Sequence, residues 1–103
     1  MLYCKLVRDK IPQIIEKNGK HALIETLSDR DYEVFLERKL DEEVYEYHDS
    51  KELEELADIL EVIMALAKIK GCSFFDLLKM KSKKAHEKGG FSKKILLVSV
   101  AEK

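Results

Sequence analysis

The sequence predicts an all-α protein, an antiparallel bundle of three long helices that follow a short N-terminal helix. Three observations support this prediction. Long stretches of the 103-residue chain place apolar side chains three and four residues apart, which is the repeat of an amphipathic helix. Capping patterns and glycines mark where these stretches begin and end. The connections between the stretches are only a few residues long, as in antiparallel bundles.

The two ends of the chain are less regular than its middle. Pro12 suits the first turn of a short helix over residues 11–17, which the following Asn-Gly pair ends. Residues 2–7 have the composition of a short strand or an extended arm. The tail, residues 95–100, is β-prone and could pair with that arm. A small terminal strand pair is therefore an optional addition to the helical fold.

Local signals bound the three long helices. A capping box, Ser-Asp-Arg-Asp at residues 28–31, is expected to begin the first. A similar pattern at residues 49–52 begins the second, which ends before Gly71. Ser73 caps the third. The expected helices run from the first cap to about residue 47, from the second cap to residue 70, and from about residue 74 to residue 88.

Size and composition indicate a single domain spanning residues 1–103. With 46% hydrophobic residues, the chain can bury a modest core. The formal net charge of −1 gives no overall field that would attract nucleic acid or a membrane surface, so neither is an expected partner. The longest apolar run is far too short to span a bilayer. The lack of a signal peptide and of any CxxC pattern predicts a cytoplasmic protein with reduced thiols.

Two pairs of acids are the most informative feature of the chain. Glu43 and Glu46 fall on the first long helix, and Glu55 and Asp58 fall on the second. Residues that face each other across an antiparallel hairpin have numbers with a constant sum, and these two pairs satisfy that condition. A spacing of three residues places both members of a pair on one side of their helix. We therefore expect the four carboxylates to converge.

The acids of the second long helix lie on an apolar stripe. The solvent-facing polar stripe of this helix is formed by Glu54, Glu61 and Lys68, which recur every seven residues. Glu55 and Asp58 instead share a direction with apolar residues. A buried and unpaired carboxylate costs several kcal/mol, so compensation is required.

Three compensations are open for these acids. Lysine or arginine could pair with them, the stripe could end in an open and hydrated cleft, or metal ions could bind. Metal binding is the leading interpretation, because four converging carboxylates repel each other without cations. Oxygen ligands without a converging His or Cys indicate Mg²⁺, with Mn²⁺ as an alternative.

At this point the chain resembles a known family. Residues 42–46 (EEVYE) and 55–58 (ELAD) have the form EExxE…ExxD, which is similar to the signature of the MazG-like all-α nucleoside triphosphate pyrophosphohydrolases. Residues 5–12 (KLVRDKIP) and 88–91 (KGGF) are similar to the start and end of a small, single-domain branch, close to the phosphoribosyl-ATP pyrophosphohydrolases. The resemblance implies Mg²⁺-dependent hydrolysis of a nucleoside triphosphate to a monophosphate and pyrophosphate, for example in nucleotide-pool house-cleaning. It also implies a homodimer or homotetramer.

The resemblance assigns roles to particular residues. Glu43, Glu46, Glu55 and Asp58 would be metal ligands, while Glu42 and Glu43 are the candidate catalytic residues, with Glu42 orienting the attacking water. A triphosphate also needs cationic partners. The candidates for binding substrate are Arg8, Lys10, Lys83, Lys84 and Lys88.

Two further hypotheses remain. The second long helix is apolar on more sides than three helices can cover, which predicts that dimerisation completes the fold. A dimer would equally suit a non-enzymatic partner-binding module, whose acids form ion pairs between subunits. The other hypothesis is hydrolysis of phosphoribosyl-ATP in histidine biosynthesis.

Overall fold

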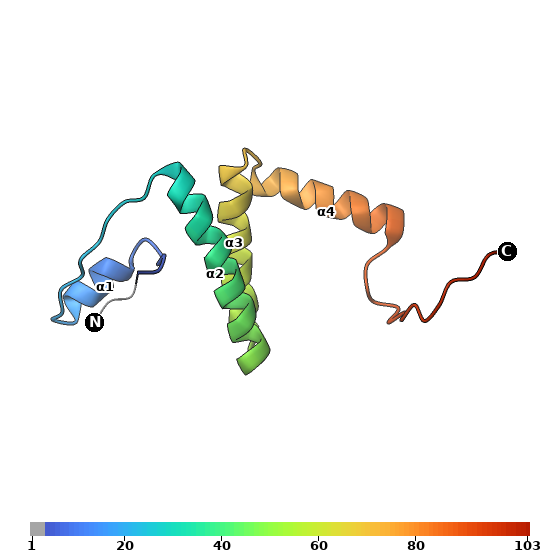
Figure 1. Ribbon diagram of the computed structural model, residues 1–103, viewed down its shortest axis with the longest axis horizontal. Coiled ribbons are helices and arrows are strands. Elements are labelled where there is room, and N and C mark those ends of the chain that lie inside the picture. The colour runs from blue at the N-terminus through green and yellow to red at the C-terminus, as the bar shows by residue number, and fades with distance from the viewer. Residues whose placement is uncertain (1–3) are drawn as a thin grey trace.

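The computed structural model describes residues 4–103, which form four α-helices (Figure 1). The helices are α1 (Ile11–Lys17), α2 (Asp29–Ser50), α3 (Leu53–Ile69) and α4 (Phe74–Lys88). This part of the chain contains no β-strand, so the all-α prediction is confirmed. The tail over residues 95–100 is extended and exposed and has no strand partner in residues 4–103, while residues 2 and 3 of its expected partner lie outside the described residues.

The serine caps begin two of the helices where the sequence predicted. The Ser28 hydroxyl accepts a hydrogen bond from the Asp31 backbone N–H at 3.2 Å, which begins α2. The Ser73 hydroxyl accepts from the Asp76 backbone N–H at 3.0 Å and begins α4 in the same way. Each bond satisfies one of the backbone donors that a helix N-terminus leaves without a partner.

The first long helix is three residues longer than predicted, because α2 ends at Ser50 rather than near Tyr47. The chain reverses at Lys51, whose φ of 60° lies in the left-handed region and whose backbone N–H donates to the Tyr47 carbonyl. The Ser50 hydroxyl accepts from the Glu52 backbone N–H at 3.1 Å. The prediction that residues 49–52 cap the second long helix is therefore wrong. Asp49 and Ser50 complete α2, and Glu52, the residue before α3, makes no side-chain capping bond.

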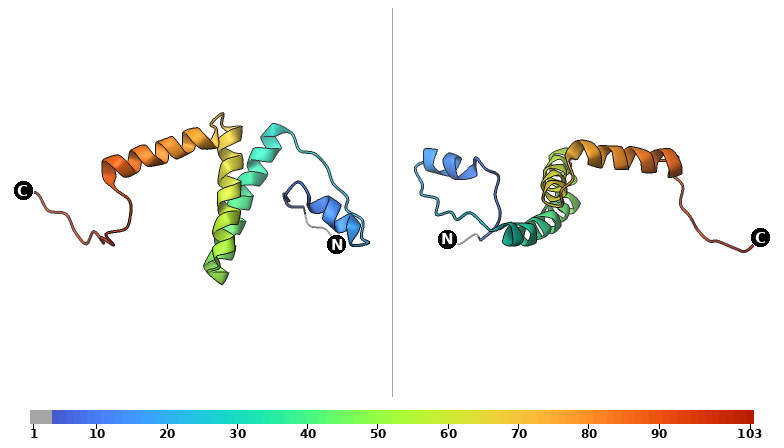
Figure 2. Two further views of the ribbon diagram at one scale, coloured as in Figure 1. Left: turned by 180° about the vertical axis from the view of Figure 1, so that it is seen from behind. Right: turned by 90° about the horizontal axis from the view of Figure 1, so that it is seen from above.

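Helices α2 and α3 pack side by side along their length and hold the core (Figures 1 and 2). Leu36 of α2 and Val62 and Leu66 of α3 are buried between them. Partly buried apolar side chains pack against these three: Leu6, Tyr32, Leu40, Ala65 and Ile69. Leu6 comes from residues 4–10, called the N-terminal segment below. This segment is therefore attached to the hairpin through an apolar contact.

The predicted bundle of three long helices does not form within one chain. Helix α4 contacts α3 but not α2, and it projects away from the hairpin on the side opposite α1 (Figures 1 and 2). The radius of gyration is 18.5 Å, whereas about 13 Å is typical of a compact domain of this length. The lysine-rich α4 has no buried residue, because it does not fold back against the hairpin.

Large apolar side chains consequently remain exposed on both α3 and α4. On α3 these are Leu53, Leu56 and Leu60, and on α4 they are Phe75, Leu78 and Met80. The prediction that α3 is apolar on more sides than its own chain can cover is confirmed. A single chain leaves much of its apolar surface in contact with water, which is unfavourable.

No helix within residues 4–103 has the length and apolar character needed to cross a membrane.

Candidate metal centre on the helical hairpin

The hairpin brings three of the four predicted acids together. One carboxylate oxygen from each of Glu43, Glu55 and Asp58 lies within 4.8 Å of the other two. Glu43 projects from α2, while Glu55 and Asp58 lie one turn apart on the facing side of α3. These three residues are called the acidic cluster below. Its formation follows directly from the antiparallel packing of α2 on α3.

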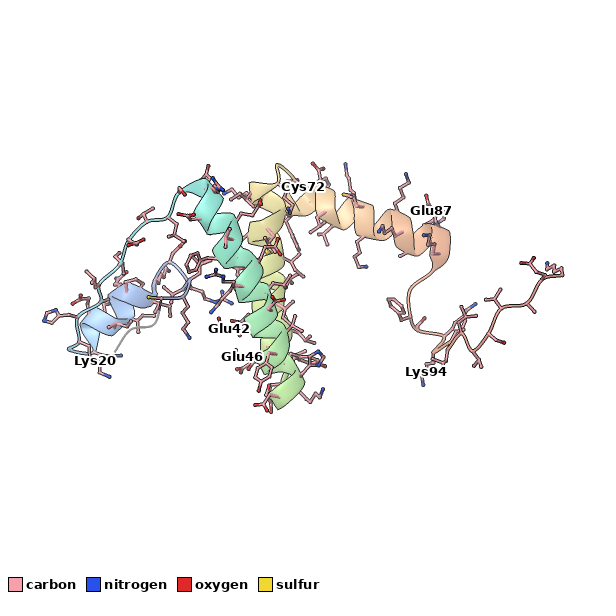
Figure 3. The ribbon with its side chains drawn as sticks, in the orientation of Figure 1. Lys20, Glu42, Glu46, Cys72, Glu87 and Lys94 are labelled. Carbon is pink, nitrogen blue, oxygen red and sulfur yellow. The ribbon has the colours of Figure 1, made fainter. Side chains whose placement is uncertain are left out.

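The fourth predicted acid, Glu46, and the candidate catalytic residue Glu42 lie beside the acidic cluster rather than in it. Glu46 is half-buried one turn beyond Glu43, and it is close enough to act on the Glu43 carboxylate electrostatically. Glu42 accepts from the Lys39 ammonium at 3.3 Å and lies 3.6 Å from that of Lys5. Figure 3 labels Glu42 and Glu46 on the part of α2 that approaches the hairpin turn. Glu42 is thus held at the edge of the cluster by two lysines.

Glu43 is the most buried member of the acidic cluster. Only 7% of the residue is exposed, and its Oε2 atom has no hydrogen-bond partner within residues 4–103. Its Oε1 atom lies 3.4 Å from the Lys39 ammonium. Burial, reinforced by the nearby charge of Glu46 and opposed by Lys39, raises the pKa of the Glu43 carboxyl above its ordinary value. One buried carboxylate oxygen is therefore left without compensation.

The charged form of the Glu55 carboxyl is also disfavoured. Loss of hydration, followed by the charges of Asp58 and Glu43, raises the pKa of the Glu55 carboxyl. No ion pair is found for Glu55 among the described residues. The acidic cluster therefore favours protonation or a bound cation over three bare carboxylates.

Arg8, which was expected to contact substrate, is a second cation that reaches the acidic cluster, in addition to Lys39. Its Nη2 atom donates to Asp58 Oδ1 at 2.7 Å, and its Nη1 atom lies 3.7 Å from Glu61 Oε1. Helical spacing could not indicate this contact, because 50 positions separate Arg8 from Asp58. Ion pairing, one of the three predicted compensations, thus accounts for part of the negative charge.

An open cavity of about 910 Å³ connects the acidic cluster to the N-terminal segment. Its lining includes Glu43 and Asp58 of the cluster together with Arg8, Lys10 and Lys39. Two of the five predicted substrate-binding residues, Arg8 and Lys10, therefore share a cavity with the acids. The arrangement places positive and negative side chains around a space large enough for a small molecule.

The other three predicted substrate-binding residues lie elsewhere in the chain. Lys83, Lys84 and Lys88 are exposed on α4. Figure 3 shows Glu87, at the same end of α4, far from Glu42 and Glu46. A single chain does not bring these lysines to the acidic cluster, because α4 projects away from the hairpin.

The raised pKa values predict how pH changes the stability of the metal-free protein. At a pH between the ordinary pKa of 4.5 and the raised pKa values, the folded state keeps protons on Glu43 and Glu55 that the unfolded chain has released. The contribution of these groups to stability is therefore fully present below pH 4.5 and is lost as the pH rises through the raised values. Urea unfolding in EDTA should show Glu55→Gln gaining stability over wild type as the pH rises toward neutrality. A constant difference between the two proteins at all pH values would contradict this prediction.

The fold and the site together define an all-helical protein with a carboxylate cluster across a helical hairpin. No protein-family model matches the chain, and no solved structure matches it. An uncharacterized protein from Mycolicibacterium smegmatis (strain ATCC 700084 / mc(2)155) is 52% identical over 42 residues, which cover 41% of this chain and 43% of that protein. The matched segment thus spans less than half the length of either protein, and the relative's name carries no information about activity.

Proposed function

We propose that the protein is a Mg²⁺-dependent pyrophosphohydrolase that converts a nucleoside triphosphate and water to a nucleoside monophosphate and pyrophosphate. The observation that carries the proposal is the acidic cluster, in which the buried Glu43 Oε2 atom has no hydrogen-bond partner. The resemblance of residues 42–46 and 55–58 to the EExxE…ExxD signature supplies the reaction class.

The residues of the acidic cluster fit a hard divalent cation. All three offer carboxylate oxygens, which Mg²⁺ and Mn²⁺ prefer, and their chemistry favours neither zinc nor copper. Glu43, Glu55 and Asp58 would hold the ion, with Glu46 as a further ligand. The chemistry that a bound Mg²⁺ supplies is stabilisation of phosphate charge and a lower pKa for the attacking water.

The remaining polar residues around the cavity would bind and orient the reactants. Arg8 and Lys10 would donate to phosphate oxygens, because both line the cavity that the acids share. Glu42 lies at the edge of the cluster and would accept a hydrogen bond from the attacking water, thereby orienting it toward the α-phosphorus. The bond between this phosphorus and the bridging oxygen then breaks, and pyrophosphate leaves.

Product identification tests the proposed reaction. Purified protein is incubated with Mg²⁺ and a panel of common and oxidised nucleoside triphosphates, together with phosphoribosyl-ATP, and the products are separated by chromatography. A monophosphate with pyrophosphate is the expected result. A diphosphate with single phosphate would indicate another phosphatase. Activity on phosphoribosyl-ATP alone would place the protein with the enzymes of histidine biosynthesis, and no activity on any substrate would contradict an enzymatic role.

The exposed apolar faces support a second proposal, that the protein is a homodimer or homotetramer. A second copy would cover Leu56 and Leu60 of α3 and would bring the lysines of α4 near a partner's acids. We expect light scattering to report at least twice the chain mass of 12.0 kDa at micromolar concentration. Leu60→Glu should weaken this association, whereas Glu54→Gln on the polar stripe of α3 should leave it unchanged. A stable monomer of the wild-type protein would contradict the proposal.

The same faces favour a non-enzymatic candidate, a helical module that binds a protein partner. This alternative requires the acidic cluster to be structural, held by Arg8 and Lys39 alone. It predicts that removing an acid destabilises the protein with or without divalent cations, because a cation would lose its partner.

A further inference from the structure

We propose that the Arg8 guanidinium is an internal counterion that occupies Asp58 of the acidic cluster when no divalent cation is bound, and that cation binding displaces it. The inference rests on the metal site of the proposed function and adds a competition between the ion and a side chain of the same protein. Displacement would free Arg8 for substrate, so that metal binding prepares the cavity for a phosphate.

The geometry shows that Arg8 and a cation would use the same acid. Arg8 Nη2 donates to Asp58 Oδ1 at 2.7 Å, a short and charge-assisted hydrogen bond. Asp58 is also one of the three residues whose oxygens converge within 4.8 Å. A divalent cation among those oxygens would repel the adjacent guanidinium and draw electron density from the oxygen that accepts its hydrogen bond. The two cations therefore compete for Asp58.

Arg8 cannot compensate the whole cluster, which leaves a reason for the ion to bind. Its contacts are with Asp58 and Glu61. The second of these acids lies outside the cluster. The buried Glu43 Oε2 atom remains without a partner, and Glu55 forms no ion pair within residues 4–103. A divalent cation offers compensation to all three acids, whereas the guanidinium serves only one of them.

The N-terminal segment, residues 4–10, is attached loosely enough for Arg8 to move. The side chain of Arg8 is 56% exposed and that of Lys5 is 47% exposed. Exposed ion pairs contribute little to stability, so the ion pairs of Arg8 and Lys5 can be replaced by contacts with water at small cost. Leu6 packs against the core and would keep the segment beside the cavity after Arg8 leaves Asp58. The segment can thus release the guanidinium without detaching from the hairpin.

Displacement would place Arg8 where a phosphate needs it. Arg8, Lys10 and Asp58 line one cavity, so a guanidinium released from Asp58 stays within the same space. An anionic substrate that arrives after the ion would meet a free arginine rather than one already paired. A triphosphate entering the metal-free protein would instead compete with Asp58 for the guanidinium.

Calorimetric titration of Mn²⁺ tests the competition through binding affinity rather than activity. Arg8→Gln removes the competitor and is expected to bind Mn²⁺ roughly two- to fivefold more tightly than wild type, the range for an exposed ion pair. Lys5→Gln is the matched control, because it removes the same charge from the same segment but pairs with Glu42 outside the cluster. It should change the affinity less than Arg8→Gln does. Equal or weaker binding by Arg8→Gln would overturn the inference.

Two further measurements separate this inference from the metal site itself. Glu55→Gln should weaken Mn²⁺ binding, so weakening in this variant with no gain in Arg8→Gln would retain the metal site and overturn the role of Arg8. Absence of Mn²⁺ binding in wild type would overturn both.

Side-chain NMR of the wild-type protein does not depend on a variant folding. Among the arginines Arg8, Arg30 and Arg38, only the Arg8 signals should move strongly when Mg²⁺ is added, and unchanged Arg8 signals would overturn the inference.

Discussion

Replacing Asp58 with Asn is expected to lower the rate of nucleoside triphosphate hydrolysis at least about a hundredfold, since changes in residues that merely support a metal ligand already cost about 10- to 100-fold. The amide keeps the size of the side chain but removes a charged oxygen from the acidic cluster. It also weakens the acceptor for Arg8. Steady-state kinetics at saturating Mg²⁺ would measure the loss, and circular dichroism would show that the helices remain.

A matched variant distinguishes a loss of activity that is specific to the acidic cluster from a general effect of removing one negative charge. Asp41→Asn makes the same substitution on the exposed side of α2 and leaves the acidic cluster intact. Its rate should equal that of wild type. If Asp58→Asn also hydrolysed the substrate at the wild-type rate, Asp58 would have no part in catalysis, and the proposed metal site would lose one of its three ligands.

Replacing Glu43 with Gln is expected to stabilise the metal-free protein by about 1 kcal/mol, the usual size of a single-substitution effect. A neutral amide of the same size loses less hydration free energy on burial than a carboxylate and is not repelled by Glu46 and Asp58. Glu43 is 7% exposed, its Oε2 atom has no partner within residues 4–103, and neighbouring acids surround it. Lys39 is not left unpaired by the change, because it also donates to Glu42 at 3.3 Å. Urea unfolding in EDTA at neutral pH and fixed protein concentration would measure the gain.

Adding Mn²⁺ should reverse this order of stability. A cation that binds the folded wild type stabilises it by mass action, and Glu43→Gln should gain less because it lacks a charged ligand. Glu37→Gln, on an exposed position of α2, is the control and should match wild type under both conditions. A purely ion-paired cluster predicts the opposite result in EDTA, with Glu43→Gln less stable than wild type.

Much of the helical fold could be predicted because its signals are local. The caps at Ser28 and Ser73 satisfy backbone donors only three residues away, so the sequence contains everything needed to begin α2 and α4. The bounds of α1 and α4 were predicted correctly from local signals, which for α1 are Pro12 in its first turn and Asn18 at its end. The end of α2 was not, because Ser50 and Lys51 form a turn between two helices whose geometry depends on their packing.

The direction of α4 could not be predicted from helical periodicity. An apolar stripe shows that a helix has a face to bury but not which surface will cover it. Short connections predicted a closed bundle, yet α4 contacts only α3. The apolar surface that one chain leaves exposed is a property of the whole molecule, and it is the basis for expecting a second copy.

The convergence of Glu43, Glu55 and Asp58 was determined by the sequence itself. Helical periodicity placed each acid on the facing side of its helix, and the short turn required the two helices to be antiparallel. Only the tertiary structure decided that Glu46 lies beside this cluster and that Arg8 reaches it. Such contacts depend on how helices seat against each other and how a distant segment packs, and a local repeat of three or four residues carries no information about either.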